Sequence, residues 1–323
     1  MLKPGVALIA VCLVLGACAG KAVSRNEGDE SGARIVFLRG DKVWSCFPDG
    51  SDERLLAATF EGRPSVVSPS PDGRTIAFLT DLGHRVGGGD LYIMNRDGGH
   101  LARITERGFF RFLDWAPDST RVYVGGRSTV ESIRTDGSER RVLSRVNGMY
   151  LLRVSPEGKR VLINRNVEGR IQPVTFAADG GAEKELPLEA NAFGMGWSRD
   201  GRRVIYGVPD PARSMIRWVD PESGDRGVFD GHGAGFYQDV RISPASDRFL
   251  TIDQEALYAV ELNGGGRTRL TPAPMAPSWD GNPGWLPDGR RVLFENGGRI
   301  YLCDANSARL SEVTTGACPA WVK

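Results

Sequence analysis

Histidine and long apolar segments are scarce in this chain of 323 residues, and charge of one sign does not predominate. The three histidines, His84, His100 and His232, are scattered without ligand spacing, so we expect no metal site and no other cofactor. Net charge is only +1, which argues against a protein that holds nucleic acid through its phosphates. The hydrophobic content of 41% still suffices for a sizeable core, so global disorder is excluded.

The N-terminus has the features of a secretory signal. Lys3 precedes an apolar run over residues 5–15, which is shorter than the ~20 residues that a membrane span needs. The run ends in Leu15-Gly16-Ala17-Cys18, which resembles the lipobox of bacterial lipoproteins. That resemblance implies removal of residues 1–17 and acylation of Cys18. The alternative is ordinary cleavage that leaves Cys18 as a free thiol.

Residues 18–33 are predicted to form a flexible tether. They are small or charged and show no periodic pattern. Ala19 stands where an aspartate would resemble the inner-membrane retention signal, so delivery to the outer membrane, facing the periplasm, is expected in a Gram-negative host. In a Gram-positive host the protein would lie on the outer face of the cell membrane. No later apolar stretch approaches spanning length, so the lipid anchor is the expected membrane contact.

A short turn pattern recurs about every 43 residues along the chain, and a period of 40–45 is typical of a β-propeller blade. Each copy is followed by a short β-rich run, a second such run and an Asp-Gly or Asn-Gly turn. The copies are Ser70-Pro71-Asp72-Gly73, Ala116-Pro117-Asp118-Ser119, Ser155-Pro156-Glu157-Gly158, Ser198-Arg199-Asp200-Gly201, Ser243-Pro244-Ala245-Ser246 and Leu286-Pro287-Asp288-Gly289.

The two ends of this region supply one further unit. Arg34-Ile35-Val36-Phe37 begins the later strands of a blade that has no first strand, and Pro319-Ala320-Trp321 echoes Pro283-Gly284-Trp285. We therefore predict a single all-β propeller over residues 34–323, with seven four-stranded blades closed by pairing of the C-terminal strand with the N-terminal blade. Six or eight blades are the alternatives.

These units resemble the TolB-like propeller repeats of bacterial envelope proteins, a WD-repeat-like family whose hallmark is a W-S-P-D-G-x-x-I-A-F-like core. The resemblance covers residues 34–323. It implies a protein that acts by binding partners, because that family generally works by interaction. TolB itself carries an α/β domain before its propeller, whereas here the tether leads directly into the first strand, so a role in the Tol–Pal system is not implied.

The repeated turn acids have a structural interpretation. Side chains such as Asp72 are expected to accept backbone N–H groups in Asx-turns, in separate blades near the outer part of one face. The tryptophans three residues before the turn acid are expected to pack in the core. The acids are Asp72, Asp118, Glu157, Asp200 and Asp288, and the tryptophans are Trp115, Trp197 and Trp285, with Trp321 in the matching position.

The sequence contains no recognisable catalytic motif. There is no G-x-S-x-G nucleophile elbow, no P-loop and no dinucleotide-binding fingerprint, so we do not expect an enzyme. The alternative is an exported propeller lyase or hydrolase with polar residues around the central channel.

Three cysteines lie in the blades that would close the ring: Cys46, Cys303 and Cys318. An exported protein permits disulfides, so a bond from Cys318 to one of the other two is one prediction. Buried free thiols are the alternative.

The connections between blades and between second and third strands vary in length, and variable loops on a rigid scaffold usually carry binding. We expect a monomer that binds an envelope protein or peptide through this variable-loop face, because aromatic and arginine side chains suit such an interface. The candidate residues are His84, Arg85, Phe110, Arg111, Phe193, His232, Tyr237, Trp279 and Asp280.

Overall fold

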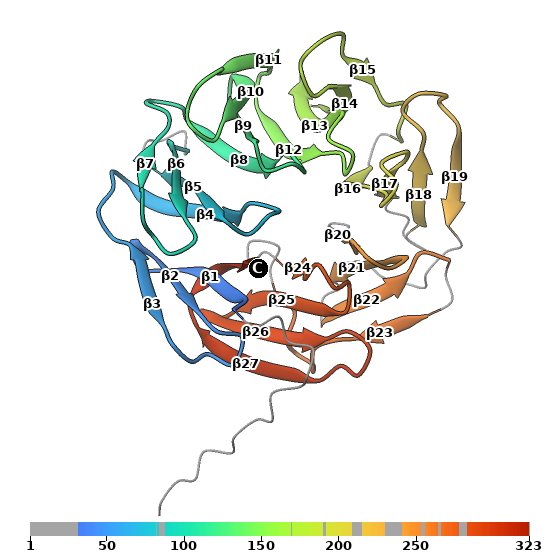
Figure 1. Ribbon diagram of the computed structural model, residues 1–323. Coiled ribbons are helices and arrows are strands. Elements are labelled where there is room, and N and C mark those ends of the chain that lie inside the picture. The colour runs from blue at the N-terminus through green and yellow to red at the C-terminus, as the bar shows by residue number, and fades with distance from the viewer. Residues whose placement is uncertain are drawn as a thin grey trace, which may run out of the picture. The chain divides into compact units, whose positions relative to one another are not determined.

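The strands form seven four-stranded antiparallel sheets, arranged as blades around a central axis (Figure 1). This computed structural model describes residues 32–81, 83, 88–168, 170–189, 192–208, 215–229, 241–252, 256–263, 266–277 and 283–322. Within these ranges no helix is long and apolar enough to cross a membrane. The predicted all-β propeller and its blade number are confirmed.

Blade 1 combines both ends of the ring, and blades 2 to 7 follow along the chain. From blade 1 to blade 7, the innermost strands are β28 (Ala317–Val322), β4 (Arg63–Pro69), β8 (Phe110–Trp115), β12 (Met149–Val154), β16 (Phe193–Trp197), β20 (Arg241–Ile242) and β24 (Gly284–Trp285). The second strands are β1 (Arg34–Arg39), β5 (Thr75–Asp81), β9 (Arg121–Gly126), β13 (Arg160–Val167), β17 (Val204–Val208), β21 (Arg248–Ile252) and β25 (Arg291–Asn296).

The two outer layers follow in the same order of blades. The third strands are β2 (Lys42–Cys46), β6 (Leu91–Asn95), β10 (Thr129–Arg134), β14 (Arg170–Ala177), β18 (Met215–Val219), β22 (Leu257–Glu261) and β26 (Arg299–Asp304). The outermost strands are β3 (Arg54–Ala57), β7 (Ala102–Arg103), β11 (Arg141–Arg145), β15 (Lys184–Glu185), β19 (Arg226–Phe229), β23 (Arg267–Arg269) and β27 (Leu310–Thr315).

The ring closes where β28 pairs with β1. The strands are antiparallel, with Ile35 opposite Trp321 and Arg34 opposite Val322. The C-terminal strand thus becomes the innermost strand of the N-terminal blade, as the sequence predicted. This pairing gives β1 a neighbour on both sides and removes the exposed edge of an open array.

Each of blades 2 to 7 places two turns on one face of the ring, which we call the turn face. One turn joins the innermost and second strands, and the other joins the third and outermost strands. A backbone hydrogen bond links the two turns in blade 2, from Arg96 N to Arg74 O at 2.9 Å. The same bond recurs in blades 3, 4, 6 and 7, where its donors are Thr135, Ala178, Leu262 and Ala305.

Local chemistry explains the repeated turn. In blade 2 the Gly73 N–H bonds to the Ser70 carbonyl, Gly73 has a φ of 70°, and the Asp72 carboxylate accepts the Arg74 N–H at 3.0 Å. The predicted Asx-turns are confirmed for the four aspartates, Asp72, Asp118, Asp200 and Asp288. These bonds favour the ionised carboxyl and hold the pKa of each below its usual value, against the effect of burial.

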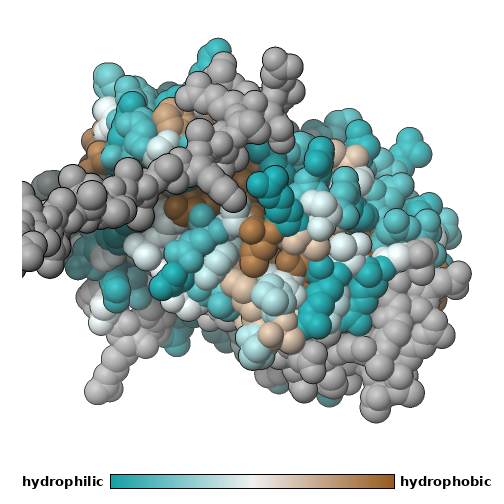
Figure 2. Space-filling model, turned by 90° about the horizontal axis from the view of Figure 1, so that it is seen from below, coloured by the Kyte–Doolittle hydropathy of each residue, from teal (hydrophilic) through white to brown (hydrophobic). Residues whose placement is uncertain are grey.

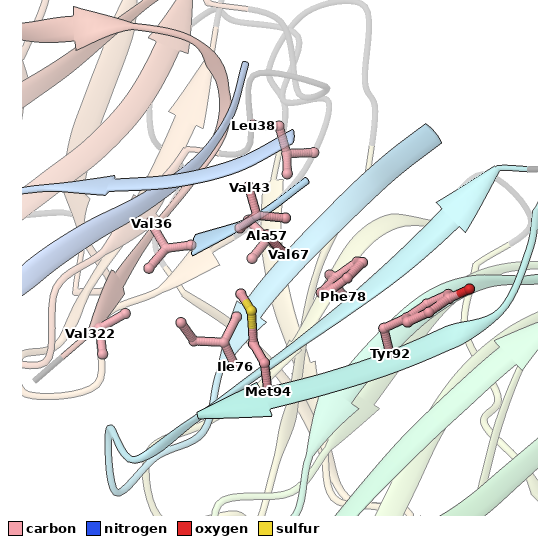
Figure 3. Packing of buried hydrophobic residues seen from close by; sticks show 10 residues of the cluster. All are labelled: Val36, Leu38, Val43, Ala57, Val67, Ile76, Phe78, Tyr92, Met94 and Val322. Atoms are coloured by element: carbon pink, nitrogen blue, oxygen red, sulfur yellow. The ribbon is translucent and has the colours of Figure 1, made fainter. Parts of the chain in front are cut away.

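The core consists of seven apolar clusters, one between each pair of neighbouring blades. Between blades 1 and 2, Val36 and Val322 face Ile76, Phe78 and Met94 (Figure 3). Each such side chain contributes about 1.5–3 kcal/mol when it leaves water. The outer surface seen in Figure 2 is mostly hydrophilic, with smaller hydrophobic areas between. Stability therefore arises between blades as well as within them.

The three cysteines within the described residues, Cys46, Cys303 and Cys318, do not form the disulfide that the sequence allowed. Cys318 lies on the innermost strand of blade 1, with its Sγ 3.4 Å from the Ser65 carbonyl of blade 2. Cys46 lies two strands further out, and neighbouring strands are ~4.8 Å apart, beyond the reach of a disulfide. The Cys303 Sγ contacts Leu270 O, on the side facing blade 6, so the buried-thiol alternative holds for Cys46 and Cys303.

Candidate functional site

The mouth of the central channel opens on the turn face, because the innermost strands end there. A cavity of about 490 Å³ is lined by the ends of β4, β8, β12, β24 and β28. A second cavity, of about 440 Å³, is lined by the ends of β12, β16, β20 and β24. The two share Val154, Pro156, Gly284 and Trp285, and so form one mouth, which we call the channel mouth.

One repeat position supplies a residue to this mouth from every blade. It lies four residues before the third residue of the turn, or directly before Trp321 in blade 1. From blade 1 to blade 7 the residues are Ala320, Ser68, Asp114, Arg153, Gly196, Arg241 and Gly284. At this repeat position, charged side chains occur in blades 3, 4 and 6, while blades 7, 1 and 2 contribute small side chains.

In blades 3, 5 and 7 a tryptophan follows this position, and its indole N–H donates to a backbone carbonyl on the free edge of the preceding innermost strand. The Trp115 indole N–H donates to Ser68 O of blade 2 at 3.1 Å. Trp197 donates to Arg153 O at 3.2 Å and Trp285 to Arg241 O at 2.8 Å, again in the preceding blade. Trp115 and Trp197 are almost wholly buried, as expected of core residues. All four tryptophans, including Trp321, also line the mouth, which the core assignment did not anticipate.

Arginine side chains of the preceding blade stack on three of these rings. Arg160 lies 5.0 Å from the Trp197 centroid, and Arg248 lies 5.2 Å from that of Trp285. Arg291 lies 4.9 Å from the Trp321 centroid across the closing seam. Each arginine begins the second strand of its blade, so the repeat itself brings cation and ring together.

Asp114 is the acidic residue among the described residues that line the mouth. Its carboxylate accepts the N–H of Val154 in blade 4 at 2.8 Å, which joins two innermost strands. Burial raises the pKa of the Asp114 carboxyl, and Arg153 and the hydrogen bonds from Val154 and Trp115 offset part of that rise. Asp114 thus acts first as a bridge between blades.

Arg199 departs from the repeat, because it stands where the five other turns have proline. Its exposed side chain lines the 440 Å³ cavity and also a third cavity of about 560 Å³ between blades 5 and 6. Ile242 lines both cavities as well. The channel mouth is therefore continuous with a cleft on the turn face, which we call the 5/6 cleft.

The structure corrects the expected position of the turn acids. Their turns join innermost to second strands, so they surround the channel mouth and do not lie near the outer part of the face. The Glu157 carboxylate lies 3.6 Å from the Arg160 guanidinium, and the Asp288 carboxylate forms the equivalent ion pair with Arg291 at 2.6 Å.

Most of the residues predicted for the variable-loop face lie outside the described residues: His84, Arg85, His232, Tyr237, Trp279 and Asp280. Phe193 begins β16, but its side chain is outside the description as well. Arg111 in β8 is exposed, as expected. The structure brings none of these described residues to the channel mouth.

Phe110 corrects that prediction, because its side chain is fully buried and not exposed. It packs against Ala77, Leu79 and Leu91 of blade 2. Its neighbour Phe109 is the exposed aromatic, with 37% of its surface accessible. Side chains alternate along a strand, so an assignment that is wrong by one residue exchanges the buried and exposed rings.

Sequence reasoning missed the charged mouth residues Asp114, Arg153, Arg199 and Arg241. The sequence signal that could have identified them is that residue type varies from blade to blade at these fixed positions of an otherwise regular repeat, where the backbone does not dictate the side chain. Among the residues described, no group of three or more His, Cys, Asp or Glu side chains is placed to hold a metal ion.

Comparison with known proteins shows the fold. No family model matches the chain. The tricorn protease of Thermoplasma acidophilum is 23% identical over 299 residues, which is 89% of this chain but 25% of that protein. The chain thus spans about a quarter of the length of this curated relative.

Solved structures agree. A crystal structure of tricorn protease superposes with a TM-score of 0.68 at 12% identity, over 90% of this chain and 34% of that one. TolB from Acinetobacter baumannii gives 0.57 at 16% identity, over 90% and 82% of the two chains. A putative TolB from Agrobacterium tumefaciens gives 0.55 at 18% identity, over 67% and 86%. The chain is a seven-bladed β-propeller similar in fold to TolB proteins and to part of tricorn protease.

Proposed function

We propose that this propeller is a binding scaffold that takes up an extended segment of another protein in its channel mouth. The observation that carries the proposal is the mouth itself, two joined cavities of about 490 and 440 Å³ with tryptophan and proline in their walls. A concave, mostly apolar site with a few polar groups is the usual form of a ligand site. Tryptophan and arginine are also enriched among the residues that dominate protein interfaces.

The walls of the mouth favour a chain over a compact partner. Each innermost strand pairs with a neighbour on one side only, so its free edge faces the axis and the backbone groups along that edge lack a strand neighbour. The structure caps some of these groups with tryptophan indoles and with Asp114, and an extended peptide offers matching donors and acceptors to others. Binding at the variable-loop face remains a prediction from the sequence.

The setting that we propose is the bacterial cell envelope, with the chain exported and held by acylated Cys18. The signal-like run over residues 5–15 and the lipobox-like residues that end at Cys18 support this setting. The fold shared with TolB proteins is consistent with it. A propeller enzyme is the weaker candidate, because Asp114 is the acid in the described lining of the mouth and it already bridges two strands.

A heptapeptide display selection on the immobilised full chain tests the proposal. Pro156, exposed in a turn and shared by both cavities, is replaced by tryptophan to fill the mouth. The matched control is Ala102→Trp, on exposed outermost strand β7. We expect fluorescence anisotropy to show that selected peptides bind the wild type and Ala102→Trp equally and bind Pro156→Trp at least about tenfold more weakly. Equal binding to both variants, or no selected peptide, would reject the channel mouth as the site.

A further inference from the structure

We propose that the segment bound in the channel mouth is acidic, that its carboxylate lies against Arg153, Arg199 and Arg241, and that its chain continues into the 5/6 cleft. This inference rests on the proposed function and specifies the chemistry of the partner. Three consecutive blades each place an arginine in one cavity. Arg153 and Arg241 occupy the same repeat position in blades 4 and 6, and Arg199 lies in the turn of blade 5.

Charge complementarity is the first argument. The three guanidinium groups line the same 440 Å³ cavity, and no acid is among its described lining residues. Asp114 in the adjoining cavity offsets part of the charge of Arg153. Among the described lining residues, three positive charges stand against one negative charge, so this part of the mouth is cationic. Apolar walls that restrict water strengthen the attraction to an anion, and arginine pairs readily with carboxylates.

The sequence of blade 5 supplies the second argument. The turn needs a residue with the φ of proline at the position of Arg199, and proline occupies it in blades 2, 3, 4, 6 and 7. Arginine is therefore not there for the geometry of the turn. Its Nη1 lies 3.4 Å from the Ala245 carbonyl of blade 6, which directs the side chain across the boundary between the two blades.

The continuity of the cavities supplies the third argument, because it sets the path of the bound chain. Arg199 and Ile242 belong to both the 440 Å³ cavity and the 560 Å³ cleft. Beyond them the lining of the cleft combines the charged side chains of Asp200, Arg203 and Asp247 with apolar ones. An acidic residue thus fits at Arg199, with apolar residues on its mouth side and residues without net charge on its cleft side.

The two sides of the mouth differ in chemistry, and this difference specifies which side chains a bound segment places on each side. Blades 7, 1 and 2 contribute Gly284, Ala320 and Ser68, which leave room for bulky side chains beside Trp285 and Trp321. Blades 4 to 6 contribute the arginines. A bound segment with an aromatic or aliphatic residue next to an acid matches both halves, whereas a uniformly apolar segment would desolvate the guanidinium groups and offer them no anion.

The test repeats the heptapeptide selection on the full chain and on single variants. Arg199→Met keeps the length of the side chain and removes its charge. Arg202→Met is the matched control, because Arg202 is exposed three residues away and lines none of these three cavities. We expect peptides selected on the wild type and on Arg202→Met to be enriched in Asp and Glu, and those selected on Arg199→Met to lose the enrichment. Arg199→Lys should restore it in part.

Affinity gives the second readout. A selected peptide and its copy with Asp and Glu replaced by Asn and Gln should differ about tenfold in Kd for the wild type, equivalent to about 1.4 kcal/mol. That difference should shrink in Arg199→Met and at high salt.

The outcomes separate the two proposals. Selected peptides that Pro156→Trp excludes, but that carry no excess of acids, would overturn this inference and leave the proposed function standing. Acidic peptides that bind Pro156→Trp and the wild type alike would overturn both. Competition by free glutamate at the same concentration as the peptide would show a small-carboxylate site and overturn the extended path.

Discussion

At the scale of single residues, one tryptophan position serves both the fold and the proposed site. The ring of Trp197 is buried between blades, its N–H closes the edge of the preceding innermost strand, and Arg160 covers one face. The same ring forms part of the wall of the channel mouth. A side chain held by three kinds of contact loses little entropy when a partner binds, which is the advantage of a preformed interface.

The hydrogen bond of this tryptophan can be tested alone. Trp197→Phe keeps a ring but leaves the Arg153 carbonyl without the indole donor, and an unsatisfied buried group costs about 1–3 kcal/mol. The control is Trp44→Phe, because the buried Trp44 indole has no hydrogen-bond acceptor within the described structure. We expect urea unfolding of the full chain to show a clearly lower midpoint for Trp197→Phe than for Trp44→Phe. Equal midpoints would mean that the bond contributes nothing.

Sequence reasoning at this scale succeeded where the chemistry is local. The bonds of Asp72, Asp118, Asp200 and Asp288 follow from turn geometry within a few residues, so the pattern predicted them. The prediction that Phe110 is exposed was wrong, because its exposure depends on where β8 begins, and packing against blade 2 determines that start. A repeat gives the spacing of such residues but not the face that each one occupies.

At the scale of strands and blades, the seam between blades 7 and 1 has its own polar connection. The Arg39 guanidinium of β1 forms two hydrogen bonds of 2.8 Å with Glu53, which directly precedes β3. Thr314 of β27 bonds to both side chains. The network therefore joins β1 and the residue that precedes β3, both in blade 1, to β27 in blade 7.

The network should make the seam sensitive to acid. Its hydrogen bonds lower the pKa of Glu53 from 4.5 to about 2, so the stabilisation is complete above pH 4.5 and is lost as the pH falls toward 2. Because Glu53 is a third exposed, Glu53→Gln should cost only about 1 kcal/mol or less at pH 7. Urea unfolding from pH 7 to pH 2 should show the wild type and the variant converging on acidification. A difference that persists at pH 2 would assign the loss to packing and not to charge.

The closing strand offers a second test of the seam. Trp321 is half-buried, packs beside the cluster that contains Ile35 and Leu293, and stacks with Arg291. Trp321→Ala should cost about 2–3 kcal/mol, below the range for a wholly enclosed aromatic. Tyr150→Ala, at a ring that is 55% exposed, should cost less than about 0.5 kcal/mol. Thermal melts of both variants measure the contrast, and equal melting temperatures would contradict a closure that depends on β28.

At the scale of the whole molecule, the repeat predicted the ring but not its asymmetry. Six turns, a matching C-terminal strand and the hairpin signals give seven blades, because each depends on local chemistry repeated at one period. The charged side of the channel mouth depends on which blades lie next to one another around the axis. Arg153 and Arg241 are 88 positions apart, and only the circular arrangement brings them into one cavity.

Thiol labelling reports on the ring as a unit. Cys46 and Cys303 are buried at the two seams that flank blade 7, and burial raises the pKa of each to about 12, so both lack the reactive thiolate. We expect iodoacetamide at pH 8 to modify half-buried Cys318 first, with Cys46 and Cys303 reacting together on denaturation. Peptide mass mapping measures the order. Early labelling of Cys46 would show an open seam, and a disulfide-linked peptide would contradict the reduced state of the three cysteines.

The pairing of β28 with β1 also has a consequence for biosynthesis. Translation produces β1 long before its inner neighbour β28, so blade 1 stays incomplete until β28 has been translated. During that interval the inner edge of β1 presents unpaired backbone groups, which are a template for pairing with other chains. A chain truncated before β28 therefore keeps an open edge at β1, so we expect such a product to be more prone to aggregation and proteolysis than the closed ring.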